Sequence, residues 1–155
     1  MKNNVLISEY HNTFIVLGHN SSPFTSINIY ATGSLFSSFA IAVGNFNDDT
    51  QLDIVVANRN GDNVSVLLGY GNAMFANQTT YFTSYDSSPY FVAVGDINYD
   101  SLLYIAVANA GTNNIGVFLG YANRTFANQT TYSTGSNSYP SSVAIVIELK
   151  VSDGC

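Results

Sequence analysis

The sequence predicts an all-β fold: a β-propeller-like array of four-stranded antiparallel sheets, or blades. Three observations carry this prediction: a long internal repeat, short β-branched runs separated by Gly, Asn and Asp, and a change from apolar to polar strands within each repeat. The repeats amount to about three blades, whereas propellers have typically four to eight. The chain is therefore expected to form an incomplete propeller.

The internal repeat is long and contains no insertion. Residues 69–81 (GYGNAMFANQTTY) return as residues 120–132 (GYANRTFANQTTY), and residues 43–49 (VGNFNDD) return as residues 94–100 (VGDINYD), both with an offset of 51. A fixed period near 50 residues is typical of propellers and other repeat arrays.

One repeat contains four expected strands, at residues 39–43, 52–57, 64–68 and 75–83. Their lengths, their β-branched residues and the turn residues between them favour strands over helices. The first three are nearly all apolar and the fourth is polar. A propeller blade needs this order, because its inner strands are covered on both faces while its outermost strand meets water.

These units divide the single repeat domain, residues 1–155, into a partial blade (12–38), two full blades (39–89 and 90–140) and a first strand with a divergent tail (141–155). In the tail the loop pattern is lost, because Ile147, Leu149 and Val151 stand where polar residues are expected. We expect either self-association or further blades to complete the ring.

Composition excludes several classes of partner. The chain has 46% hydrophobic but only 9% charged residues, against roughly 25% in typical domains, and its net charge is −6. Only four basic residues occur, so we expect no nucleic-acid binding. No apolar run approaches the ~20 residues of a membrane span, so we expect no membrane insertion. Residues 1–10 lack the long apolar core of a signal peptide.

The chemical signal lies in two loops between the first and second strands of the full blades. Positions one, three and five of such a tight loop should turn their side chains toward one centre, while Phe46 and Ile97 turn back into the core. Side-chain oxygens at positions one, three, five and nine, with a backbone carbonyl at position seven, suit a Ca²⁺ site. The expected ligands are Asn45, Asn47, Asp49, Gln51 and Asp53 in the first loop, and Asp96, Asn98, Asp100 and Leu102 in the second.

Residues 43–58 (VGNFNDDTQLDIVVAN) and 63–69 (NVSVLLG) together resemble an FG-GAP repeat, also called a VCBS-like repeat, the blade of integrin-alpha-type β-propellers. The resemblance covers roughly residues 12 to 146. It implies a blade that holds calcium in the loop between its first and second strands, within an extracellular or cell-surface domain for adhesion or ligand binding.

The loops depart from the family pattern at several positions. Asn45 stands where the family usually has Asp, and Tyr104 replaces the closing Asp of the second loop. Thr50 and Ser101 replace the glycine at position six, although both are less comfortable in a left-handed turn conformation. We therefore expect weak calcium sites. In the alternative interpretation, the Asn and Asp residues only form turns by bonding their own backbone.

We expect a non-enzymatic interaction module, because the sequence offers no nucleophile with a general base and an oxyanion donor. A protein or glycan would be its ligand. The alternatives are a metal-free structural repeat array and a carbohydrate-binding or accessory propeller of an enzyme. Asn77 and Asn128 lie in sequons at equivalent positions of the outer strand, so we expect both to be exposed and open to N-glycosylation.

Overall fold

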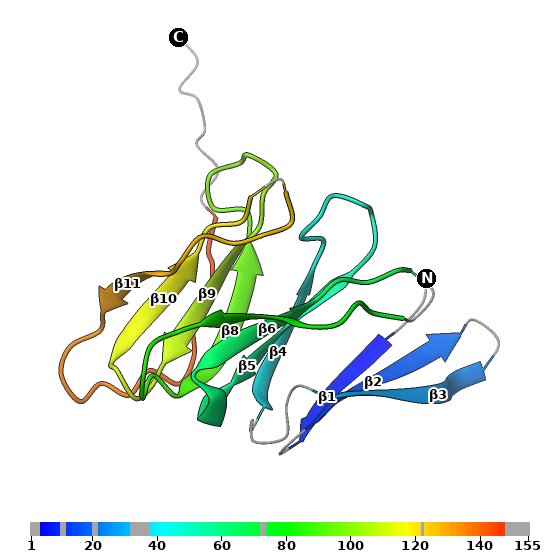
Figure 1. Ribbon diagram of the computed structural model, residues 1–155, viewed down its shortest axis with the longest axis horizontal. Helices are drawn as coiled ribbons and strands as arrows, with labels where there is room; N and C mark the ends of the chain where they lie inside the picture. The colour runs from blue at the N-terminus through cyan, green and yellow to red at the C-terminus, as the bar shows by residue number, and fades with distance from the viewer. Residues whose placement is uncertain are drawn as a thin grey trace, which may run out of the picture.

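The chain forms three antiparallel sheets that stand side by side (Figure 1). The computed structural model describes residues 4–9, 12–19, 22–31, 38–71, 74–121 and 123–147 of the 155. Within these ranges the only helix is a single 3₁₀ turn, η1 (Arg59–Gly61). The expected all-β array of blade-like sheets is confirmed, and the sheets do not close into a ring within the described part of the chain.

The second and third sheets are complete four-stranded meanders. The second has the order β4-β5-β6-β7, with β4 (Ser38–Gly44), β5 (Asp53–Asn58), β6 (Asn63–Leu67) and β7 (Thr79–Phe82). The third has the order β8-β9-β10-β11, with β8 (Pro89–Gly95), β9 (Tyr104–Asn109), β10 (Asn114–Phe118) and β11 (Thr130–Ser133).

The strand registers of these two sheets repeat with the offset seen in the sequence. Asn58 pairs with Asn63 between β5 and β6, and Asn109 pairs with Asn114 between β9 and β10. The first pairs of strands match likewise, down to the shift of register near the start of β4 and of β8. The two repeats are therefore equivalent residue by residue.

The first sheet holds three strands in the order β1-β2-β3: β1 (Asn4–Glu9), β2 (Asn12–His19) and β3 (Ser22–Ala31). Thr13 pairs with Tyr30 in the same register as Val64 with Tyr81, so β2 and β3 correspond to the third and fourth strands of a repeat. The strand β1 therefore takes the place of the second strand. The partial blade expected at 12–38 thus begins earlier, at Asn4.

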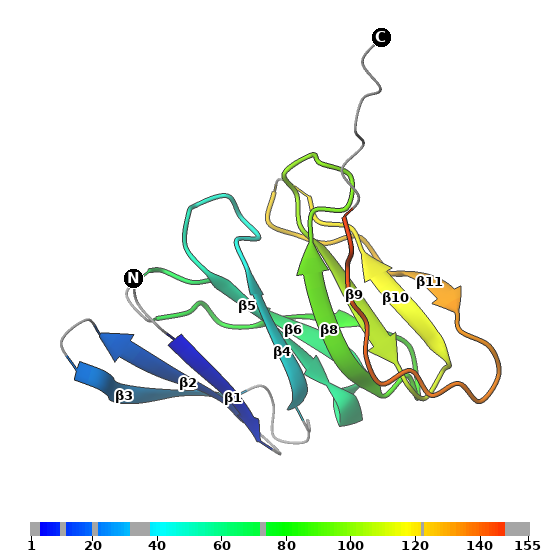
Figure 2. The same cartoon turned by 180° about the vertical axis from the view of Figure 1, so that it is seen from behind.

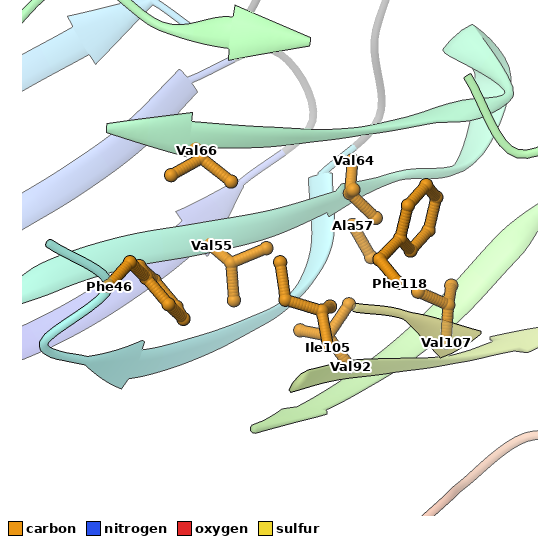
Figure 3. Packing of buried hydrophobic residues seen from close by; sticks show 9 residues of the cluster. All are labelled: Phe46, Val55, Ala57, Val64, Val66, Val92, Ile105, Val107 and Phe118. Carbon is orange, nitrogen blue, oxygen red and sulfur yellow. The ribbon is translucent and has the colours of Figure 1, made fainter. Parts of the chain in front are cut away.

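Apolar side chains fill the space between the second and third sheets (Figure 3). All residues of β5 and β6 are buried, whereas β11 is exposed throughout and β7 is exposed except at the half-buried Tyr81. The expected gradient from apolar inner to polar outer strands is confirmed. Burying one such valine or isoleucine stabilises the fold by about 1.5–3 kcal/mol. The cluster comprises Phe46, Val55, Ala57, Val64, Val66, Val92, Ile105, Val107 and Phe118.

One aromatic contact recurs between successive sheets. The Tyr30 ring of the first sheet meets Phe75 of the second edge-on, with ring centroids 5.3 Å apart and planes at 79°. Fifty-one residues further along, Tyr81 of the second sheet meets Phe126 of the third, again at 5.3 Å and with planes at 83°. The sheets therefore pack on one another by the same geometry at both junctions.

The segment that follows the third sheet, residues 141–147, is here called the tail segment. It lies against the third sheet on the face turned away from the second (Figure 2). A Cβ added at Gly95 would lie 2.9 Å from Ile145 Cγ2. The tail segment forms no strand, which differs from the first strand expected there, because no described strand lies beside it to pair with. Leu149 and Val151 of the divergent tail lie outside the described residues.

In each full sheet the last residue of the second strand is a buried asparagine, Asn58 in β5 and Asn109 in β9, whose side chain links neighbouring strands. In the second sheet Asn58 Nδ2 donates to Asn63 Oδ1 and to Ser65 Oγ, at 2.8 and 2.7 Å, and its Oδ1 accepts from Ser38 Oγ at 3.3 Å. All the polar atoms of this side chain thus have partners, as burial requires.

In the third sheet, two substitutions change this arrangement around Asn109. Gly116 replaces the serine, and the Gln129 side chain enters the freed space and accepts from Asn109 Nδ2 through Oε1, at 3.4 Å. Pro89 replaces the other serine and has no hydroxyl to donate. Asn109 Oδ1 is accordingly buried without a hydrogen-bond partner.

We expect the substitution Pro89→Ser to stabilise the fold. A serine here would supply the donor that Ser38 supplies in the second sheet, removing a cost of about 1–3 kcal/mol for an unsatisfied buried acceptor. The lost rigidity of proline would offset about 0.4–1 kcal/mol of this gain. Urea unfolding should therefore show a higher midpoint, and Ser38→Ala should show a lower one. An unchanged or lower midpoint for Pro89→Ser would contradict this explanation of the orphaned oxygen.

Candidate metal-binding loops

The first loop connects β4 to β5, and its polar side chains turn inward. The backbone N–H of Asp49 donates to Asn45 Oδ1 and to Asn47 Oδ1, both at 3.2 Å, so these two oxygens converge on one point. Asp49 Oδ1 accepts from the Gln51 N–H at 2.8 Å, and Asp49 Oδ2 accepts from Asn47 Nδ2 at 2.8 Å. The side chains at positions one, three and five are therefore gathered by the backbone of the loop itself.

The second loop, between β8 and β9, repeats these bonds. The N–H of Asp100 donates to Asp96 Oδ1 at 3.2 Å and to Asn98 Oδ1 at 3.4 Å, and Asp100 Oδ1 accepts from the Leu102 N–H at 2.8 Å. Asp96 Oδ2 also accepts from the Ser101 N–H at 2.8 Å. The additional bond exists because Asp96 has a second oxygen where Asn45 has an NH₂ group.

Both loops use the left-handed backbone region at positions four and six. The φ angles are 56° at Asp48 and 67° at Thr50 in the first loop, and 62° at Tyr99 and 68° at Ser101 in the second. These angles agree with the expectation that Thr50 and Ser101 adopt the left-handed conformation that glycine adopts more easily. Each such residue is strained by the contact between Cβ and the following carbonyl.

The apolar residue at position two differs between the loops. Phe46 is buried and its ring packs edge-on against Phe126 of the third sheet, at 5.5 Å, as expected. Ile97 is 43% exposed, so the expectation that it turns into the core was wrong. The reason is its place in the array: Phe46 is covered by the next sheet, whereas no further sheet covers the equivalent position beside Ile97 in the described chain.

Asp53, the expected ligand at position nine, is fully buried at the start of β5. Its Oδ2 accepts from the Phe46 N–H at 2.7 Å, and its Oδ1 accepts from the Gly69 N–H at 2.8 Å. Burial raises the pKa of this carboxyl, and the two backbone hydrogen bonds offset part of that rise. Asp53 thus ties the loop to the hairpin turn after β6, and its service as a metal ligand stays a prediction.

Tyr104 occupies position nine of the second loop. Partial burial raises the pKa of its phenol, and the negative charges of Asp100 and Asp96 raise it further. Gln51 and Leu102 donate their N–H groups to the loops, as described above, and the use of their carbonyls as ligands stays a prediction.

The donor set fits a hard cation such as Ca²⁺ in kind: carboxylate and amide oxygens converge in each loop. Among the described residues, no group of three or more His, Cys, Asp or Glu side chains is placed to hold a metal ion. Each loop relies instead on asparagine for part of its oxygens, at position three and, in the first loop, at position one.

Other expectations concern the surface. Asn77 and Asn128 are exposed, at the equivalent positions just before β7 and β11. The turn beginning at Gly69 is a hairpin turn, closed by a hydrogen bond from the Tyr70 N–H to the Met74 carbonyl at 2.9 Å. Gly69 is required there, because a Cβ would overlap the Leu52 carbonyl oxygen. No helix of the described residues is long and apolar enough to cross a membrane.

Comparison with known families agrees with this geometry. Residues 45–107 match the model of the FG-GAP-like repeat, a span that runs from the start of the first loop through the second loop into β9. Residues 45–107 are therefore similar to an FG-GAP-like repeat. No curated protein and no solved structure matched the chain.

Glycine at position six should relieve backbone strain in these FG-GAP-like loops. We expect Thr50→Gly and Ser101→Gly each to raise the free energy of unfolding by about 0.5–1 kcal/mol, the relief of left-handed strain less the added freedom of the unfolded chain. Urea unfolding in excess chelator measures this without any contribution from metal. Thr80→Gly, on the exposed strand β7, is the control and should destabilise. A loss of stability in both loop variants would contradict the strain.

Replacing Asp53 by alanine should leave the N–H groups of Phe46 and Gly69 buried without an acceptor, at a cost of about 1–3 kcal/mol each. The pKa of Asp53 is higher in the folded than in the unfolded chain, so the folded chain binds more protons between the two values. The contribution of Asp53 to stability is then full below the unfolded pKa and declines as pH rises through the folded pKa.

The difference in unfolding free energy between the wild type and Asp53→Ala should therefore be larger at about pH 3.5 than at about pH 7. Urea titrations of both proteins at the two pH values measure it. A difference that grows with pH would show that hydrogen bonding to the carboxylate outweighs its burial.

Proposed function

We propose that the chain is a non-enzymatic interaction module of the extracellular type, built as a propeller segment whose loops are stabilised by calcium, and that it binds a protein or glycan ligand. FG-GAP repeats are generally extracellular-type domains, and the match over residues 45–107 supports a propeller-type module. Asn77 and Asn128 are exposed, so both sequons are accessible for N-glycosylation, a modification of extracellular proteins.

One observation carries the calcium proposal: two loops with different sequences adopt the same bonded shape. In each, the oxygens of positions one and three meet at the N–H of position five. A turn that served only to connect strands would not need three inward oxygens in both copies. The loops are already folded around a common point, so a cation would meet preorganised ligands.

The two loops differ in the charge that they offer. Because both oxygens of Asp53 accept backbone N–H groups, Asp49 is the one carboxylate among positions one, three and five of the first loop, and Asp48 is exposed at position four. The second loop has Asp96 and Asp100 at positions one and five. We therefore propose that the second loop attracts a divalent cation at least as strongly as the first, although Tyr104 replaces its closing aspartate.

We expect both sites to be weak. With a dissociation constant of ~10⁻⁴ to 10⁻³ M, as in extracellular calcium modules, a free Ca²⁺ of about 2 mM stabilises a site by about 0.6–1.8 kcal/mol. For a chain of this size that energy raises Tm by about 1–7 °C per site. Thermal unfolding followed by circular dichroism, in Ca²⁺ and in excess chelator, measures the rise, and Mg²⁺ is the control because it demands a stricter geometry.

Matched variants assign the response to each loop. Asp49→Ala should remove the first loop's part of the calcium-induced shift, Asp100→Ala the second loop's part, and Tyr104→Asp should enlarge the second. The readout is the difference in Tm between the two buffers, because each alanine also removes a bond to its own loop and lowers Tm in both. Superimposable melts of the wild type would favour the metal-free repeat array. Glycan binding that survives chelation would favour the carbohydrate-binding alternative.

A further inference from the structure

The outer face of the third sheet, turned away from the second, corresponds residue by residue to a buried interface. In the second sheet the residues that face the third include Val55, Ala57, Val64, Val66 and Tyr81. Adding the repeat offset to the residues of this apolar cluster gives eight positions on the outer face of the third sheet, and each of these is again apolar or aromatic: Phe91, Ala93, Ala106, Ala108, Ile115, Val117, Leu119 and Tyr132. The outer face of the third sheet thus has the apolar character of a buried interface, although no described sheet covers it.

Burial on this outer face is incomplete. Val64 and Val66 are buried, whereas the equivalent Ile115 and Val117 in β10 are only half-buried. Tyr81 packs against Phe118 and Phe126 of the next sheet, at 6.1 and 5.3 Å. Its equivalent Tyr132 is 59% exposed. The exposed Ile97 lies in the loop at the end of the same sheet.

The tail segment covers only part of this face, in the place where a further sheet would have its first strand. It corresponds to β4 and β8 in the repeat, and Val143 and Ile145 are half-buried while their neighbours Ser142, Ala144 and Val146 are exposed. This alternation is that of a strand with one face on a sheet. No described strand pairs with it, so its backbone edges are open to strand addition.

The first sheet has the complementary deficit. Its three strands correspond to the second, third and fourth strands of a repeat, and the edge of β1 is where a first strand would pair. In the full sheets that place is filled by β4 beside β5 and by β8 beside β9. One tail segment and one first sheet together make a complete four-stranded unit.

We propose that two copies of this chain assemble head to tail into a six-sheet propeller, in which the first sheet of each copy packs on the outer face of the other copy's third sheet and pairs β1 with its tail segment. Six sheets lie within the range of four to eight that closed propellers adopt, whereas three lie below it. Each contact joins the first sheet of one copy to the third sheet of the other, and two such contacts close the ring. The proposal rests on the sheets and does not depend on calcium.

The repeated aromatic contact gives the interface its register. Tyr30 meets Phe75 and Tyr81 meets Phe126 with the same spacing. The next tyrosine in this series is Tyr132, and the phenylalanine equivalent to Phe75 and Phe126 in the first sheet is Phe24, in β3. The proposal therefore places Tyr132 of one copy opposite Phe24 of the other.

The first test is the mass in solution, by light scattering on a size-exclusion column over a dilution series. The wild type should have twice the chain mass of 16.7 kDa. Tyr132→Asp should weaken the dimer about tenfold or more, because it places a charge on a central aromatic contact. Tyr70→Asp is the matched control: Tyr70 is 61% exposed on a hairpin turn and should leave the mass unchanged. A wild type that runs at 16.7 kDa at its highest soluble concentration overturns the proposal.

The second test establishes orientation in full-length chains that also carry Cys155→Ser. Tyr132→Cys in one chain and Phe24→Cys in another should cross-link through a short bismaleimide when the two are mixed, and neither should cross-link alone. Efficient cross-linking of Tyr132→Cys with itself would mean that two outer faces meet symmetrically, and the head-to-tail ring would be wrong. Circular dichroism of each variant confirms that it is folded, so that a missing cross-link also counts against the ring.

Discussion

The packing of one sheet on the next is the constraint on which the rest of this structure depends. The strands β5 and β6 are buried along their whole length, so both faces of each full sheet need a neighbour. The recurrence of one tyrosine–phenylalanine contact at both junctions shows that the sheets are stacked by a single rule. Because strand registers also recur, the two candidate loops emerge at the same end of the array (Figure 1).

The shape of the loops is set locally and is then tied to the sheet. In both loops the bonds from position five hold the inward oxygens, whether position nine is an aspartate or a tyrosine. Position nine therefore does not shape the loop. Asp53 instead joins the first loop to the hairpin turn through Phe46 and Gly69, so a substitution at this residue acts on the junction of two connections.

Much of the fold could be predicted from the sequence, because each strand and turn of the full unit occurs in two copies with similar residues. The four strands of each full unit and the apolar-to-polar order followed from residue types and spacing. The left-handed conformation at Thr50 and Ser101 followed from the family resemblance, which implies a glycine at position six. The burial of Asp53 could not, because a carboxylate that accepts two backbone N–H groups has the same spacing as one that binds a metal. The strand β1 was missed because its hairpin to β2 is shorter than the hairpin between β5 and β6. Residues of β1 and β5 are therefore not separated by the 51 residues that relate the rest of the repeats.

Three departures from the repeat pattern have one cause. Ile97 is exposed where Phe46 is buried, Tyr132 is exposed where Tyr81 packs on two rings, and β10 is half-buried where β6 is enclosed. All three occur in the third sheet, at positions whose second-sheet equivalents face the next sheet. Polar residues would be expected there if this face were made for water, yet the sequence has kept it apolar. These residues therefore have the character of an interface, and the tail segment covers only the place of the first strand of a further sheet.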